Sequence, residues 1–224
     1  MTLPLRIPFH MSGLARPFGH LYFGMCAKDL VSFRELLARL EQSDDMNDEY
    51  ELLYQQALEA SVRPVVFGAM CVEAVLFDLA TALFGSGFAS ENDRKTPLNR
   101  FKSIAERVDR ETPSDEHPAS QAIAQLFKAR NRLVHYKSEP YVAADWNAVI
   151  ASFSDRHTIH MQGLSVAFSA AVHLSLYFDG NIFEELRLLP SFKKPEYWQT
   201  VVPASLHTDV HQCIAAHHAA GADA

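Results

Sequence analysis

The feature that most constrains the fold is a long apolar run at residues 65–84, VVFGAMCVEAVLFDLATALF. A helix that is apolar on almost every face must be buried against other elements. The run therefore predicts a central helix. Gly85 and Gly87 are expected to end this helix, because glycine is common just past a helix C-terminus. Pro64 either begins the helix or kinks a longer one.

Apolar residues recur at helical spacing along the rest of the chain, whereas the alternation typical of half-buried strands is scarce. Thr96 and Pro97 form an N-cap and first-turn pair that opens one of these helices. The pattern predicts an all-α helical bundle. The predicted helices cover residues 29–41, 47–61, 65–84, 97–109, 118–136, 143–153, 161–178 and 208–218.

Three parts are expected along the chain. Residues 1–28 combine three prolines and three glycines with aromatic residues, and are interpreted as an irregular N-terminal arm. Residues 29–180 form the helical bundle, and residues 181–224 form a C-terminal extension with a short helix. The hydrophobic content of 48% is sufficient for a sizeable core.

Charge and cysteine content restrict the classes of function. The formal net charge of −7 argues against a protein that coats nucleic acid, but it is compatible with a local basic cleft. The three cysteines are far apart and odd in number, which favours free thiols in a reducing cytoplasm. The first ten residues lack the apolar segment of a signal peptide. We therefore expect a cytoplasmic protein.

Residues 160–178 carry no formal charge, but they include Gln162, three serines and two histidines. A buried bundle helix is therefore a better interpretation than a membrane span, and no membrane association is expected. Together with residues 65–84, this stretch offers more apolar surface than a small bundle easily covers. That excess predicts a homodimer.

Arg130 stands on the apolar side of the predicted helix 118–136. A guanidinium there must reach a cleft or meet an acidic partner. Asn131 and His135 are four residues apart and share a neighbouring face. The three polar side chains are expected to converge on a phosphate-sized space near the helix end. The apolar side comprises Ile123, Leu126, Phe127 and Val134.

Glu73 is a second polar anomaly, because it lies inside the apolar central helix. A carboxylate at such a position needs a partner, and Arg130 or Asn131 is the natural candidate. We therefore predict that the two helices pack together, with Glu73 orienting the polar group. Local positive charge near that group comes from Lys128, Arg132 and Lys137.

A purely structural interpretation of these residues is open at this point. An arginine near a helix C-terminus interacts favourably with the helix dipole, and a nearby histidine can cap the last carbonyl groups. Arg130 and His135 would then stabilise the fold without taking part in chemistry.

The string Arg130-Asn131-Arg132-Leu133-Val134-His135 resembles the R-N-x-x-x-H signature of the HEPN superfamily. The context is similar too, since the motif closes a helix and an earlier apolar helix carries a lone glutamate. The resemblance covers residues 47–178 as a helical bundle and is specific over the motif itself.

This resemblance implies a bundle that dimerises and brings two copies of the motif to one cleft. Many HEPN proteins are metal-independent endoribonucleases that act as toxins of toxin–antitoxin pairs, in abortive infection or in antiviral defence. The implied function is such a ribonuclease, without cofactor or metal. Its partners would be RNA, a second copy of the chain, and an antitoxin or defence-system protein. The alternative is a non-catalytic HEPN module for dimerisation and the binding of a nucleotide or protein.

The expected catalytic residues are Arg130, Asn131 and His135. Histidine can act as base or acid near neutral pH, and a planar guanidinium can hold a phosphate bidentately. Attack by the 2′-hydroxyl would leave a 2′,3′-cyclic phosphate. The residues expected to bind substrate are Lys128, Arg132, Tyr136 and Lys137.

One position departs from a HEPN subgroup that is paired with nucleotidyltransferase antitoxins. That subgroup has a modifiable tyrosine two residues after the histidine, where this chain has Lys137 and places Tyr136 one residue earlier. Control by such a modification is therefore not expected.

The C-terminal extension is rich in histidine. His207 and His211 have the i, i+4 spacing of a metal pair on a helix, but no strong ligand pattern is completed around them. The segment is interpreted as a solvated terminal helix without a metal site.

Overall fold

The computed structural model describes residues 18–42, 48–109, 111–134, 160–178, 186 and 188–222, and all regular elements within these ranges are helical. The predicted all-α class is confirmed. A helix at His160–Ala167 comes directly before α6. The remaining elements are α1 (Phe18–Glu41), α2 (Asp48–Asn92), α3 (Pro97–Asp109), α4 (Pro118–Val134), α6 (Ser169–Phe178), α8 (Pro195–Trp198), the 3-10 helix η1 (Ala204–Leu206) and α9 (His207–Ala222).

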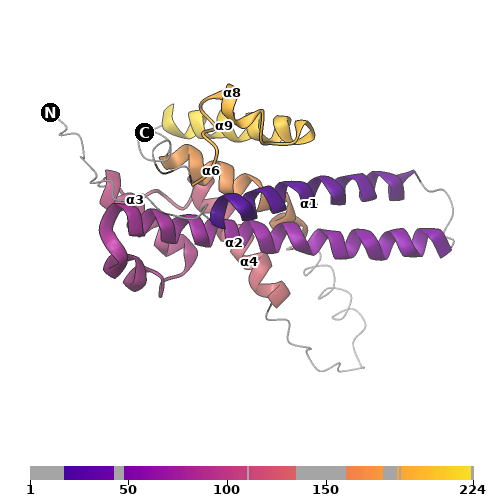
Figure 1. The fold of residues 1–224 in the computed structure, drawn as a ribbon, viewed down its shortest axis with the longest axis horizontal. Coiled ribbons are helices and arrows are strands. Elements are labelled where there is room, and N and C mark those ends of the chain that lie inside the picture. Colours follow the sequence, from indigo (N-terminus) through magenta and orange to yellow (C-terminus); the bar gives the residue numbers. More distant parts are fainter. Residues whose placement is uncertain are drawn as a thin grey trace.

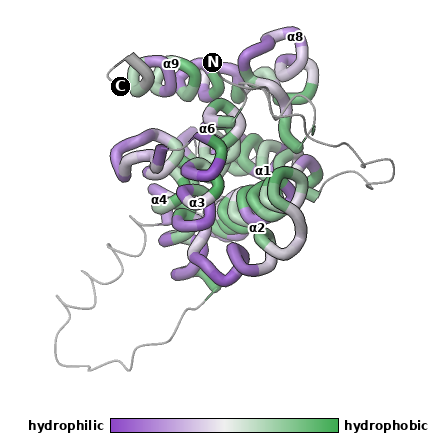
Figure 2. Tube along the Cα trace, turned by 90° about the vertical axis from the view of Figure 1, so that its left-hand side faces the viewer, coloured by the Kyte–Doolittle hydropathy of each residue, from purple (hydrophilic) through white to green (hydrophobic). Residues whose placement is uncertain are grey.

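Helices α1 and α2 form a long antiparallel pair whose free end extends to one side of the molecule (Figure 1). At the other end, α3 and α4 pack on α2, and α6 packs on both α2 and α4. Helix α9 lies across α6 as the outer layer (Figures 1 and 2). Figure 2 shows that α1 and α2 carry strongly apolar stretches, as expected for the centre of the bundle.

Helix α2 is longer than the sequence predicts. It begins at Asp48 and runs through Pro64, so the two predicted helices 47–61 and 65–84 are one element. The carbonyl of Pro64 accepts a hydrogen bond from the Cys26 thiol of α1, at an S–O distance of 3.4 Å. The helical course is interrupted at Gly85, whose φ of 85° and ψ of 166° are not helical, but Gly85 and Gly87 do not end α2 as predicted. The chain then resumes a helical course to Asn92.

Helix α1 corrects the prediction of an irregular arm over residues 1–28. It begins at Phe18, while residues 1–17 lie outside the described ranges. Burial of Phe23 and Ala27 stabilises this first half of the helix and outweighs the low helix propensity of its glycines. Gly19 also permits a close approach to α2, because a Cβ atom there would lie 2.5 Å from Cγ2 of Val75.

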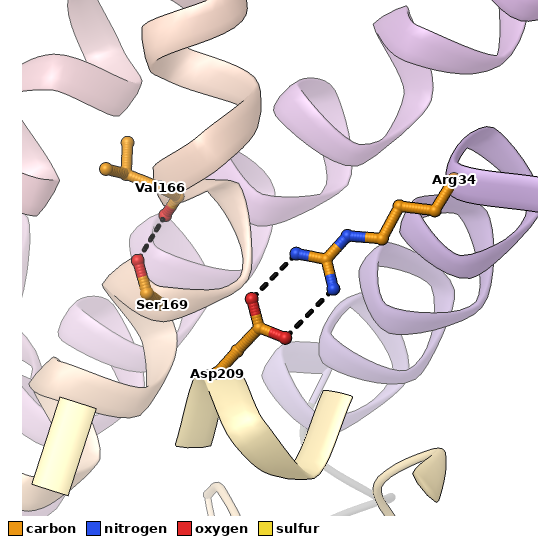
Figure 3. A network of polar contacts seen from close by, with 4 residues as sticks. All are labelled: Arg34, Val166, Ser169 and Asp209. Atoms are coloured by element: carbon orange, nitrogen blue, oxygen red, sulfur yellow. Dashed lines mark hydrogen bonds and ion pairs between the residues drawn. The ribbon is translucent and has the colours of Figure 1, made fainter. Parts of the chain in front are cut away.

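The predicted helix 161–178 is two helices, His160–Ala167 and Ser169–Phe178, bent by 47°. At the bend, the Ser169 hydroxyl donates a hydrogen bond to the Val166 carbonyl at 3.4 Å (Figure 3). By length and composition α2 is long and apolar enough to cross a membrane, and so is the bent pair taken as one span. Half of the most apolar window of α2 is buried inside the bundle.

The C-terminal extension is an integral layer of the bundle, which corrects its interpretation as a solvated terminal helix. Helix α9 packs on α6 and buries Val210 and Cys213. Arg34 of α1 and Asp209 of α9 form a bidentate ion pair on the outer side of this contact (Figure 3). Cys26, Cys71 and Cys213 are free thiols and are all buried. The predicted helix 143–153 lies outside the described residues.

Candidate functional site

Helix α4 positions the Arg130–Asn131 pair. Its first turn is capped by His117, whose Nδ1 accepts a hydrogen bond from the backbone N–H of Ala119 at 3.2 Å. Ile123 and Leu126 are fully buried, as the apolar periodicity predicts. A Cβ atom on Gly163 would lie 2.0 Å from Cβ of Ala129, so the helix His160–Ala167 crosses α4 in close contact beside Arg130. This contact fixes the last turns of α4 in the bundle.

Arg130 and Asn131 are joined directly. Nη1 of Arg130 donates a hydrogen bond to Oδ1 of Asn131 at 3.1 Å. Arg130 is half-buried and Asn131 is exposed. Among the described residues, no carboxylate forms an ion pair with Arg130. Among the described residues, the guanidinium is therefore oriented by a neutral amide and not by an acid.

Some of the other residues predicted around the motif lie in the described part of α4, and the rest lie beyond it. Lys128 and Arg132 are exposed on α4. His135, Tyr136 and Lys137 lie outside the described residues. Val134 was predicted on the apolar side of the helix but is 54% exposed. The last turn of α4 projects beyond α2 (Figure 1), so α2 does not cover this part of the apolar stripe.

The predicted partnership between Glu73 and the Arg130–Asn131 pair is not observed among the described side chains. Helices α2 and α4 do pack together, but Glu73 lines an open cavity of about 670 Å³ between α1, α2 and α3. The reason is geometric, since Glu73 lies on the side of α2 that faces α3 and the start of α1. The cavity wall includes Phe18, Tyr22, Glu73, Phe77, Asp78 and Arg100.

Arg100 is a buried cation that the sequence analysis missed. Its side chain is 7% exposed, and Nη2 contacts Oδ1 of Asp93 at 2.8 Å and donates to the Asp93 carbonyl at 2.9 Å. Asp78 lies in the same cavity, and burial raises the pKa of its carboxyl group. A sequence signal for Arg100 exists, because it precedes the buried Ile104 by four residues and so shares the apolar face of α3.

A second group that the sequence analysis did not assemble is a cluster of three histidines. His117, His173 and His217 come from the start of α4, the middle of α6 and the end of α9. The rings of His117 and His217 are 5.8 Å apart, centroid to centroid. His173, a polar residue within an uncharged apolar helix, was the available signal. In the part of the chain that the structure describes, no three His, Cys, Asp or Glu side chains are arranged to hold a metal ion.

Comparisons with protein-family models, with curated proteins and with solved structures give no match for this chain. The functional assignment therefore depends on the local motif, the helix that carries it and the chemistry of its side chains.

Proposed function

We propose that this chain is a metal-independent endoribonuclease of HEPN type, with Arg130, Asn131 and His135 as its catalytic residues. The observation that carries the proposal is the state of Arg130. Its guanidinium is bonded to the Asn131 amide at 3.1 Å and, within the described ranges, has no carboxylate to neutralise it. A structural arginine on a buried stripe would be expected to meet an acid, whereas a phosphate-binding arginine must remain available.

The side chains support RNA cleavage by attack of the 2′-hydroxyl on the adjacent phosphorus. The O–P bond to the 2′-oxygen forms while the bond to the 5′-oxygen breaks, which leaves a 2′,3′-cyclic phosphate and a 5′-hydroxyl. Arg130 would stabilise the charge that develops on the phosphorane. His135 would take the proton of the 2′-hydroxyl, and His135 of a second copy would give a proton to the leaving 5′-oxygen.

Two further features belong to the same proposal. The second histidine requires a homodimer, and the exposed Lys128 and Arg132 would contact the RNA backbone beside the cleft. A cytoplasmic toxin or antiviral effector of this kind would be held inactive by an antitoxin or a defence-system partner. Sedimentation at micromolar concentration tests the dimer, and a monomer would contradict the two-fold site.

The function is tested by incubating total cellular RNA with the wild-type chain, Arg130→Ala and His135→Ala in excess EDTA, followed by mapping of the RNA ends. His20→Ala and Arg94→Ala are the matched controls, because both side chains are exposed and lie outside α4. We expect cleavage by the wild type and both controls, with cyclic phosphate ends. Either motif variant should lose at least about 100-fold in rate, the usual effect of removing an acid–base or oxyanion-stabilising group.

The proposal fails if the folded wild-type dimer leaves RNA intact, and a non-catalytic HEPN module would then be favoured. It also fails if His135→Ala cleaves at the wild-type rate. Circular dichroism and thermal unfolding of each variant separate a loss of chemistry from a loss of fold. If stability falls and the rate per folded molecule does not, Arg130 and His135 are structural residues.

A further inference from the structure

His117 and His217 are in ring contact where the outer helix α9 packs on α6, and His173 of α6 lies close enough for both to lower its pKa. His117 lies directly before α4, His173 lies in α6, and His217 lies near the end of α9. The His117 and His217 rings contact edge to face at 5.8 Å, and the Tyr177 ring of α6 contacts His117 at 5.1 Å. The cluster therefore joins three elements that are distant in sequence.

The surroundings of the cluster suit neutral imidazoles and disfavour charged ones. His173 is 8% exposed, and its Nδ1, like that of His217, is buried without a hydrogen-bond partner among the described residues. The Nδ1 atom of His117 already accepts the N–H of Ala119. Protonation puts an N–H on both ring nitrogens, so it would create buried donors without acceptors and would break the cap at Ala119.

We propose that His117, His173 and His217 form a proton-sensitive latch, and that acidification releases α9 from α6 while the rest of the bundle stays folded. The latch uses none of the motif residues, and it can be tested without any measurement of RNA cleavage. Its release would uncover the side of α6 on which α9 packs.

The direction of the pH effect follows from proton linkage. Burial lowers the pKa of His173 and of His217 from 6.5 to about 4, and repulsion from neighbouring histidines adds to the shift. Burial also lowers the pKa of His117. A released α9 returns these groups to their ordinary pKa values, so release takes up protons between pH 6.5 and 4. Docking of α9 is therefore strongest above pH 6.5 and weakens as the pH falls.

Other charged groups face the cluster and act in defined directions. Electrostatic repulsion from Lys193 and His218 lowers the pKa of His217 further, so both residues favour release. Asp109, at the end of α3, is hydrogen-bonded to Tyr177, and burial raises the pKa of its carboxyl group. A raised pKa in the docked state stabilises docking as the pH falls, so Asp109 opposes release and cannot cause it. Glu111 also acts on Tyr177 and Asp109.

The accessibility of the three cysteine thiols distinguishes release of α9 from global unfolding. Cys213 lies on α9, one turn before His217, and is 4% exposed. Cys26 and Cys71 lie in the α1–α2 contact and are 1% and 0% exposed. Release of α9 alone would expose the Cys213 thiol and leave the other two protected, whereas global unfolding would expose all three together.

The test is pulsed labelling of the full chain with 4,4′-dithiodipyridine, which reacts with thiols in acid, from pH 7.5 to 4. Mass spectrometry reports the rate at each cysteine, divided by the rate of the urea-unfolded chain at the same pH. We expect a flat Cys213 rate above pH 6.5. Below it, the rate should rise by up to about tenfold per pH unit for each histidine that takes up a proton on release. Cys26 and Cys71 should stay protected.

Variants on two different helices locate the effect. His173→Gln and His217→Gln should each reduce the pH slope of Cys213 labelling, even if the variant also loosens α9 at neutral pH. His20→Gln, an exposed histidine on α1, should keep the wild-type slope. A flat wild-type profile, equal labelling of all three cysteines at every pH, or an unchanged slope in both cluster variants would each overturn the latch.

Discussion

Arg34 of α1 and Asp209 of α9 form a two-pronged ion pair, with Nη1–Oδ2 and Nη2–Oδ1 distances of 2.9 and 2.7 Å. The two residues are 175 positions apart in the chain. Their fork-on-fork geometry ties the outer helix directly to the central α1–α2 pair, at the end of α9 opposite the histidine cluster. Planar pairing of this kind specifies orientation as well as attraction.

The Arg34–Asp209 pair should contribute modestly to stability. Arg34 is 42% exposed and Asp209 26% exposed, so solvent screens their attraction. A double-mutant cycle with Arg34→Gln and Asp209→Asn is expected to give a coupling free energy of about 0.5 to 1 kcal/mol, at the upper end for exposed pairs. Urea unfolding of the wild type, both single variants and the double variant, at low and high salt, measures this coupling free energy. Strict additivity of the two single variants would show that the pair contributes nothing.

Gly68 should resist substitution although it lies inside a helix. A Cβ atom there would lie 2.5 Å from the carbonyl oxygen of Ala167, a backbone atom that cannot move aside cheaply. Helix propensity favours alanine by about 1 kcal/mol, but overpacking at this site should outweigh it and leave Gly68→Ala less stable by about 1 to 2 kcal/mol.

Gly24→Ala is the matched control for Gly68→Ala. It is also a helical glycine, but a Cβ atom at Gly24 would have no neighbour within 4 Å. This variant should therefore gain about 0.5 to 1 kcal/mol. Thermal unfolding of both variants tests this difference in stability. Equal shifts of Tm in the same direction would contradict the close contact between α2 and Ala167.

Asp78 should destabilise the protein at neutral pH. Burial raises its pKa, so the folded chain holds the proton more tightly than the unfolded chain does. The penalty is full above the folded pKa and disappears as the pH falls below the ordinary value of 3.8. Asp78→Asn should gain about 0.5 kcal/mol at pH 7, a small mutational effect, and nothing at pH 3. Glu91 is exposed on the same helix, and Glu91→Gln should leave the free energy of unfolding unchanged at both pH 7 and pH 3. An equal gain at both pH values would assign the effect to packing.

Arg130→Lys should separate the two interpretations of this residue. A lysine keeps the charge but loses the planar fork that grips a phosphate and bonds the Asn131 amide. If Arg130 binds the scissile phosphate, the RNA cleavage rate should fall by at least about tenfold, which corresponds to 1.4 kcal/mol of transition-state stabilisation. Unfolding free energy should change by less than about 0.5 kcal/mol, as at other partly exposed positions. A stability loss without a rate loss would favour the structural interpretation.

Much of the secondary structure was predictable from local patterns. The Thr96–Pro97 signal places the start of α3, and the Asn99 N–H donates to the Thr96 hydroxyl at 3.4 Å as an N-cap pairing requires. Gly85 marks the break in α2. The start of α1 was missed because its glycines and the prolines before it suggested irregular structure. The segment is helical because it packs against Val75 of α2. That contact depends on a helix distant in sequence, so no local pattern shows it.

The candidate site was predictable only in part. Arg130 and Asn131 were placed correctly on α4, because helical periodicity determines which residues share a face of one helix. The partner of Glu73 was not predictable, since periodicity does not tell which face of a neighbouring helix lies opposite. The pairing of Arg100 with Asp93 and the grouping of the three histidines became recognisable only when the helices were assembled.

The sequence by itself determined the all-helical class, the apolar central helix and the position of the Arg130–Asn131 pair near the end of α4. These features follow from interactions within a few turns of one helix. The tertiary structure decided that α9 docks on α6, that Arg34 meets Asp209, and that Glu73 lines the same cavity as Arg100. Such contacts join residues distant along the chain, and they are selected by the packing of whole helices, which no local pattern encodes.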